Sequence, residues 1–279
     1  MNRLIKAELI KIATKPRSYI GFIAVAAIVL LIEFAMYADG KEYLSFITQA
    51  LEQTFIIEGD FLNGNLVCFI ILQTLIIQMP LMVALVTGDL ISGEMANGTI
   101  RLLVTRPFSR NQILTAKIIA GSIYTFLLLL WLGIFALVFG LLIFGDGDLT
   151  VIKSDALVII QSGDTLWRFL LAFGVAFISL TVVSSFSLLL SCLTDNSIGP
   201  IITTMAVIIL FTIIGTLQVP VFENIKMFLF TTHMIVWRNL FDNPLDLELM
   251  YTSLGIMVLY IIGFTAASYI IFNKKDILN

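Results

Sequence analysis

Long apolar runs alternate with shorter polar segments along the chain. A helix needs about 20 mainly apolar residues to cross the hydrocarbon of a bilayer, and six runs of that order follow one another. They are Tyr19–Met36, Leu66–Thr87, Ile118–Phe144, Trp167–Leu193, Gly199–Val219 and Tyr251–Phe272. The pattern predicts an all-α membrane protein with six transmembrane helices, built as a single domain over residues 1–279.

The N-terminal arm, residues 2–15, has a helical pattern of its own. Its apolar residues Leu4, Ile5, Leu9 and Ile12 fall on one helix face, and basic residues lie elsewhere. Such a helix is suited to lie on an anionic membrane surface. The alternative is that the basic residues only set the topology.

Lys and Arg distribution predicts the orientation, because cytoplasmic segments carry the excess of these residues. Eleven of the 16 basic residues fall in the N-terminal arm, between the second and third apolar runs, or in the C-terminal tail. The other five fall on the opposite side. We therefore expect a multi-pass protein of the cytoplasmic (inner) cell membrane with both termini in the cytoplasm.

The predicted outer loops are long and rich in acidic residues, at residues 37–65, 145–166 and 220–250. Within the last of them, Met227–Phe241 is apolar and aromatic but too short to cross the membrane. We expect an interfacial or re-entrant helix there, between the fifth and sixth spans, on the outer face.

Composition agrees with a membrane protein: 59% of the residues are hydrophobic, 13% are charged, and the mean hydropathy is +1.03. Soluble domains are about 45–50% apolar and about 25% charged. The net charge of −3 gives no reason to expect a nucleic-acid partner. Cys68 and Cys192 lie inside apolar runs, so we expect packing residues rather than a disulfide.

No catalytic arrangement is evident. The one histidine is His233, which argues against a histidine-based metal site, and no Gly-x-x-x-x-Gly-Lys-Ser/Thr loop is present. We expect no enzymatic activity, cofactor or metal in this chain. Glu33, in the first span, is either an interfacial carboxylate that reaches water or a residue of a transport pathway.

The fourth span carries a stripe of small residues. Its members are Ala172, Ala176, Ser179, Ser187 and Ser191. Small side chains let helices approach closely. Packing within the chain is one interpretation of the stripe; a translocation path or a subunit contact is the other.

The segment between the second and third spans, residues 88–117, is longer than a tight turn needs. The sequence predicts a short helix broken at Gly98, an amphipathic turn over Ile100–Val104 and a stop at Pro107. Ser109 would then cap the helix that leads into the third span. A structured polar and apolar loop of this kind usually contacts a partner.

This loop resembles the signature of ABC-2-type transporter permeases. The matching positions are Glu94, Gly98, Thr99, Leu102, Leu103, Pro107, Ser109, Arg110 and Lys117. The basic arm, the six spans, the outer re-entrant segment and the Lys-Lys-Asp-Ile-Leu ending at Leu278 fit the same family. The resemblance implies that residues 88–117 couple the permease to a separate nucleotide-binding subunit, through Glu94, Gly98, Thr99, Leu102, Leu103, Pro107, Arg110 and Lys117.

We therefore expect the permease subunit of an ATP-driven ABC exporter. Its partners would be a separate ABC ATPase subunit, a second permease copy, identical or not, and membrane lipid. Two alternatives stay open: an ABC-type complex that transmits force across the membrane without transport, and a secondary carrier. The absence of ionisable residues near the middle of the spans counts against the carrier.

Overall fold

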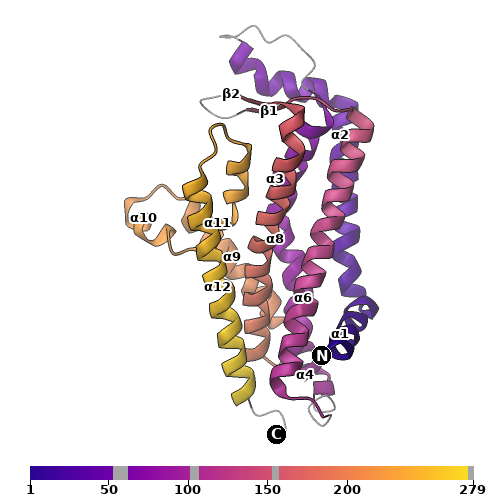
Figure 1. Cartoon of the computed structure of the whole chain (residues 1–279), viewed down its shortest axis with the longest axis vertical. Coiled ribbons are helices and arrows are strands. Elements are labelled where there is room, and N and C mark those ends of the chain that lie inside the picture. The colour runs from indigo at the N-terminus through magenta and orange to yellow at the C-terminus, as the bar shows by residue number, and fades with distance from the viewer. Residues whose placement is uncertain (53–61, 101–106, 153–156, 276–279) are drawn as a thin grey trace.

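The computed structural model describes residues 1–52, 62–100, 107–152 and 157–275. Long helices run nearly side by side and form an elongated bundle, with both termini at one end (Figure 1). We call this end the terminal end and the opposite one, which carries a β-hairpin, the hairpin end. The elements are α1 (Asn2–Thr14), α2 (Pro16–Glu52), α3 (Gly64–Thr87), α4 (Asp89–Ala96), α6 (Arg110–Gly133), the π-helix η1 (Ile134–Phe139), α7 (Gly140–Phe144), β1 (Leu149–Ile152), β2 (Leu157–Ile160), α8 (Ser162–Leu193), α9 (Gly199–Thr216), α10 (Pro220–Lys226), α11 (Phe230–Met234), the 3-10 helix η2 (Val236–Phe241) and α12 (Leu247–Lys274).

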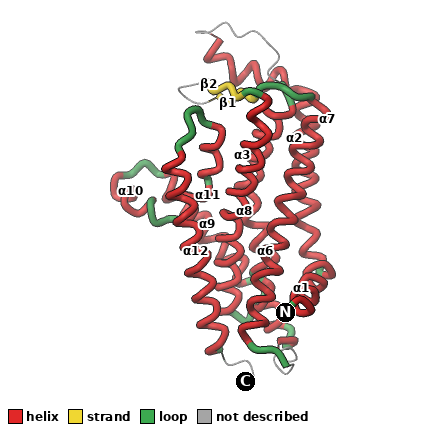
Figure 2. The backbone as a smooth tube through the Cα atoms, viewed as in Figure 1, coloured by secondary structure: helices red, strands yellow, loops and turns green. Residues whose placement is uncertain are grey.

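The described chain contains six helical segments that are long and apolar enough to cross a membrane, as predicted. The second and third segments each combine several helices, α3 with α4 and α6 with η1 and α7. Helices dominate the fold (Figure 2). The six-span architecture predicted from the sequence is therefore confirmed.

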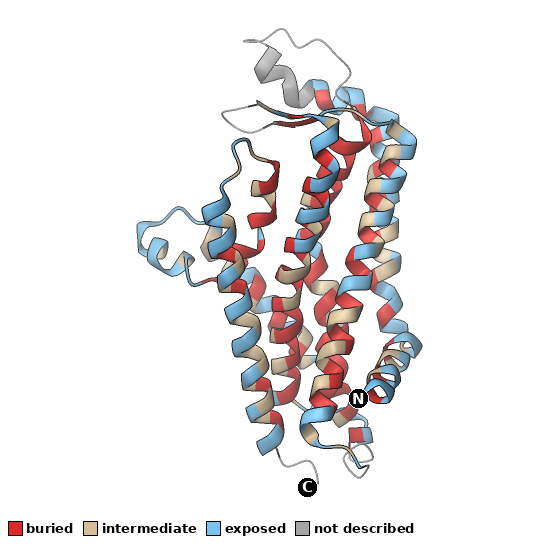
Figure 3. Ribbon diagram, in the orientation of Figure 1, coloured by how far each residue is buried: buried red, intermediate tan, exposed pale blue. Residues whose placement is uncertain are grey.

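Helix α8 is the centre of the bundle and packs against α3, α4, α6, α9, η2 and α12. In the most apolar windows of α3 and α8, 61% and 56% of the residues are buried, against 17% in α9 and 11% in α12. Figure 3 shows the same contrast between the interior helices and the exposed flank of α12. The surface of α9 and α12 is thus left to lipid or to another subunit.

The small residues of α8 lie in its buried face, as the packing interpretation requires. Ala172, Ala176, Ser179, Ser187 and Ser191 are each fully buried. Ser179 and Ser187 donate hydrogen bonds to the carbonyl oxygens of Met234 and Ala84. The two cysteines are free and buried, which confirms their role in packing.

Two of the predicted outer loops contain regular structure that the sequence analysis did not identify. Helix α2 continues through Tyr37 to Glu52, and β1 pairs with β2 in an antiparallel hairpin. Asn63 fixes this end of the bundle, because its side chain donates to the Asp148 carbonyl oxygen at 2.8 Å and caps α3. Helix formers such as Ala, Leu, Glu and Lys explain why α2 extends beyond its apolar part.

The segment between α9 and α12 is not the single helix predicted over Met227–Phe241: α11 and η2 fold back on the bundle, whereas α10 projects from it (Figure 1). The segment consists of α10, α11 and η2, and only the last two lie in the predicted range. The aromatic residues Phe230, Trp237 and Phe241 are buried. They pack on α3, α8, α9 and α12.

Glu33 does not reach water, contrary to the interfacial interpretation. It is 2% exposed, and neither carboxylate oxygen has a hydrogen-bond partner in the described part of the chain. Its surroundings include Gly140, at the start of α7. A buried ionisable group in a membrane span suggests a functional role.

Candidate functional site

The loop that resembles a coupling element starts with α4, which continues from α3 past Gly88 at the terminal end. The first N–H groups of any helix lack partners within the helix. In α4 the hydroxyl oxygen of Ser191 accepts hydrogen bonds from the backbone N–H of Ile91, at 3.2 Å, and of Ser92, at 2.8 Å. Helix α8 therefore holds the first turn of α4 directly.

Helix α4 ends where the sequence predicts, at a glycine turn. Its last residue is Ala96, and Gly98 has a positive φ of 68°, a conformation that favours glycine. Residues 96–99 are exposed, whereas residues 89–94 are buried. The sequence thus places a short exposed turn on a buried, fixed helix.

Four charged side chains from three helices close a ring beneath this turn. We call them the charge ring: Glu8 and Lys11 of α1, Glu94 of α4 and Lys117 of α6. The Lys117 Nζ lies 2.9 Å from Glu8 Oε2 and 2.9 Å from Glu94 Oε2. The Lys11 Nζ lies 2.6 Å from Glu8 Oε1 and 2.7 Å from Glu94 Oε1. Two cations and two anions alternate, so the ring is neutral as a whole.

Lys117 is the most deeply buried member, with no exposed side-chain surface. It also donates to the Leu90 carbonyl oxygen at 2.8 Å. Partial burial alone would lower the pKa of Lys11, but hydrogen bonds to Glu8 and Glu94 outweigh it and raise that pKa above 10.5. Removing one partner of a buried ion pair is costly, because the other charge stays buried. The ring therefore joins α1, α4 and α6.

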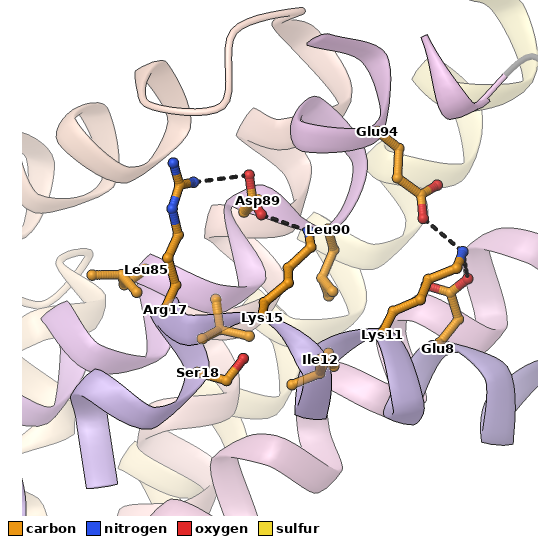
Figure 4. A pocket seen from close by; sticks show the side chains of 11 residues that line it. Glu8, Lys11, Ile12, Lys15, Arg17, Ser18, Leu85, Asp89, Leu90 and Glu94 are labelled. Atoms are coloured by element: carbon orange, nitrogen blue, oxygen red, sulfur yellow. Dashed lines mark hydrogen bonds and ion pairs between the residues drawn. The ribbon is translucent and has the colours of Figure 1, made fainter. Parts of the chain in front are cut away.

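A second cluster fixes the start of α4, around Asp89. Its carboxylate accepts from Lys15 Nζ at 2.7 Å and from Arg17 Nη1 at 3.1 Å, and Ser197 donates to it as well. Figure 4 shows the lysine and the arginine converging on Asp89, next to the contact of Lys11 with Glu8 and Glu94. A carboxylate in the first turn also interacts favourably with the helix dipole.

Arg110 and Lys275 connect the start of α6 to the end of α12. The Arg110 guanidinium donates to the carbonyl oxygens of Phe272, Asn273 and Lys275, the last at 2.7 Å. These carbonyl groups belong to the last turn of α12 and the residue after it, where helical partners are missing. Ser109 caps α6 through a capping box with Gln112, which confirms the predicted cap.

A groove of about 560 Å³ runs between α1 and α4 at this end. Arg3, Leu4 and Ala7 form the α1 side, and Asn97, Thr99 and Phe108 line the opposite side. Glu8, Lys11 and Glu94 line it too. The groove thus lies between the exposed turn and the amphipathic arm, with the charge ring at its base.

The predicted coupling residues separate into two groups. Gly98, Thr99 and Pro107 are exposed, whereas Glu94 and Lys117 are buried in the charge ring and Arg110 binds the end of α12. Leu102 and Leu103 lie outside the described residues. The role of Glu94 in coupling stays a prediction; in this structure its carboxylate pairs with Lys11 and Lys117 of its own chain.

Sequence reasoning missed Glu8, Asp89 and Ser197. Glu8 follows Leu4 by four residues and precedes Ile12 by four, so it lies on the apolar face of α1. An acid in that position signals a buried partner, and the sequence carries this signal. Asp89 and Ser197 are 108 residues apart in the chain, and no local pattern links them.

A family model matches most of the chain. The model is described as a protein of unknown function, DUF2705, and it matches residues 22–278. The chain belongs to the DUF2705 family. The matched region contains Glu94 and Lys117 but begins after Glu8 and Lys11, so α1 lies outside it.

One relative of this DUF2705 chain is the uncharacterized protein YhcI of Bacillus subtilis (strain 168). The two sequences are 28% identical over 201 residues, which cover 70% of this chain and 63% of the relative. The alignment thus spans less than two thirds of the relative's length. Neither name assigns an activity.

Proposed function

We propose that this chain is the permease subunit of an ATP-driven ABC exporter. The ATP would be hydrolysed by a separate nucleotide-binding subunit that docks on the groove between α1 and the turn at residues 96–99. The proposal rests on the way in which that turn is attached to the rest of the bundle. An exposed loop is tied through α4 to α1 and α6 by the charge ring, and to α8 by Ser191.

This attachment of the turn to the bundle is suited to transmitting force. Rigid elements joined by ion pairs and hydrogen bonds move as a unit, whereas a loosely attached loop would absorb the movement. A push on the turn at Thr99 would pass to α8, which contacts most of the other spans. The terminal end would then face the cytoplasm, as the distribution of basic residues predicts.

The resemblance of residues 88–117 to the coupling loop of ABC-2-type permeases supports the same proposal. The 279 residues contain no P-loop, so the proposal assigns ATP hydrolysis to a separate subunit. The exposed flanks of α9 and α12 leave room for a second permease copy. We place the chain in the cytoplasmic (inner) membrane, with both termini inside the cell.

The docking test uses the exposed turn, where a variant leaves the charge ring intact. Asn97→Arg and Thr99→Arg should weaken co-purification of the ATPase subunit at least about tenfold, because each places a bulky charge in the groove. Gln161→Arg, at the exposed hairpin end, is the matched control and should have no effect. Undiminished co-purification with both turn variants would refute docking at this groove.

A secondary carrier is the second candidate, and Glu33 is the observation in its favour. A buried, unpartnered carboxylate in a span is typical of proton-coupled pathways. Glu33→Gln separates the two proposals in a transport assay with reconstituted protein. ATP-dependent transport should persist in this variant, whereas a proton-coupled carrier should lose its activity.

A further inference from the structure

A second cavity, of about 230 Å³, lies where α3, α9 and the α11–η2 segment meet. Helix α9 has only 18 residues, or about 27 Å of helix, whereas α8 has 32 residues, or about 48 Å. In Figure 1, α9 gives way to α10 well short of the hairpin end. The cavity lies beside the last turns of α9, next to Ile76 and Pro80 in the middle of α3.

Three buried polar atoms at this cavity have no hydrogen-bond partner in the described chain. They are Thr231 Oγ1, Thr232 Oγ1 and Arg238 Nε, and Thr231 as a residue is only 8% exposed. Two other threonines that line the cavity differ: Thr212 and Thr216 donate to carbonyl oxygens of their own helix. Buried donors without partners are rare and each calls for an explanation.

The charge at this cavity is also uncompensated. Arg238 lies over the Trp237 ring, 5.8 Å from its centroid, but forms no ion pair with a described residue. None of the residues that line the cavity is acidic. Burial lowers the pKa of Arg238, and no carboxylate offsets the effect. A guanidinium among transmembrane helices normally pairs with an anion.

We propose that this cavity binds an anionic amphiphile, a molecule with a single phosphate or carboxylate headgroup on a hydrocarbon tail. The acidic headgroup would pair with Arg238 and accept hydrogen bonds from the Thr231 and Thr232 hydroxyls. Charge-assisted hydrogen bonds of this kind are the strong ones. The site goes beyond the proposed ATP-driven transport and does not depend on it.

The size and lining of the cavity indicate how much of the amphiphile it holds and where the hydrocarbon tail lies. Pockets that hold a whole small molecule have about 300–1,000 Å³, so this cavity accommodates a headgroup and the start of a chain. Ile76, Ile77 and Ile208 provide an apolar wall. Beyond it, Ile209 and Ile213 of α9 are 54% and 53% exposed. The rest of the tail lies along this apolar flank.

The test uses the purified full chain in phosphatidylcholine nanodiscs. A phosphatidic acid with a photoreactive acyl chain is added as a minor component, and labelled peptides are identified by mass spectrometry. We expect labelling of residues 208–216 and 231–238. A fatty-acid analogue with the same photoreactive group tests whether a carboxylate serves as well as a phosphate. A diacylglycerol analogue, which lacks the acid, should not label above background.

Variants test the headgroup contacts. Arg238→Gln should reduce labelling about tenfold, and Arg238→Lys should restore most of it. Lys226→Gln is the matched control, because it removes a cation of the nearby α10 that does not line the cavity. If Arg238→Gln does not fold, the Thr231→Val, Thr232→Val double variant should still lower labelling about threefold. Equal labelling by diacylglycerol, or labelling unchanged in the Arg238 and threonine variants, would overturn the proposal.

Discussion

At the scale of single residues, the charge ring depends most on Lys117. A lysine without any exposed surface is stable as a cation only if anions and a carbonyl oxygen replace its water. Glu8, Glu94 and the Leu90 carbonyl oxygen do so. Lys11 is 41% exposed, so its two ion pairs are screened by solvent and contribute less.

Removing Lys117 should therefore destabilise the protein strongly. Lys117→Met leaves two buried carboxylates with one half-exposed cation, and we expect a loss of about 3 kcal/mol in the free energy of unfolding. Thermal or denaturant unfolding of the purified protein measures it. Lys6→Met, on the exposed face of α1, is the control and should change stability by at most about 0.5 kcal/mol.

The double variant Glu8→Gln, Lys117→Met tests whether the loss comes from the ring. It removes one charge of each sign, so it should be more stable than the sum of the two single variants predicts. If the losses in the free energy of unfolding are strictly additive, or if Lys117→Met is as stable as the unchanged protein, the charge ring does not stabilise the fold.

The sequence predicted part of this chemistry. The resemblance to ABC-2-type permeases included Glu94 and Lys117, which are two of the four ring members. Their ion pair with each other depends on how α1, α4 and α6 pack. The predicted coupling role of Arg110 stays a prediction, and the structure adds that this side chain binds the end of α12. In each case a long-range contact decides what a side chain does, and local patterns do not contain it.

At the scale of elements, patterns with a local cause were the most predictable. The length of the apolar runs predicted the spans, Gly98 predicted the end of α4, and Ser109 predicted the start of α6. The segment at Met227–Phe241 was only half correct. Its helix breaks into α11 and η2, because its aromatic side chains pack into the bundle from several sides.

The connection between α4 and α8 provides a prediction for one element. Ser191→Ala removes the acceptor of two buried N–H groups, a loss of about 1–2 kcal/mol. Amide hydrogen exchange at Ile91 and Ser92 should then accelerate about tenfold. Ser185→Ala is the control, since Ser185 is on the same helix and its hydroxyl bonds to its own backbone. Equal exchange in both variants would show that α4 is held by other contacts.

At the scale of the whole molecule, both termini and the turn at residues 96–99 lie at one end of the bundle, and the hairpin lies at the other (Figure 1). This arrangement is what an even number of spans requires. The bundle itself does not distinguish its two ends with respect to the cell. The 11-to-5 distribution of basic residues does, and it predicts that the terminal end faces the cytoplasm.

Cysteine labelling in intact cells tests this orientation. A cysteine at Gly163 should react with an impermeant thiol reagent, because nothing lies within 4 Å of a side chain added there. A cysteine at Asn97 should react only after the membrane is permeabilised. Cys68 and Cys192 are buried and set the background. Labelling of Asn97→Cys from outside would reverse the topology.

A photocrosslinker at Thr99 tests whether a separate ATPase docks at the groove beside this residue. A photoreactive phenylalanine replaces Thr99 in the full chain, and the same residue at Gln161 serves as the control. Irradiation of intact cells should join the Thr99 variant, and not the Gln161 variant, to a protein with a Gly-x-x-x-x-Gly-Lys-Ser/Thr loop. If the Thr99 variant is cross-linked to no such ATPase while the protein is folded and in the membrane, an ATPase does not dock at this groove.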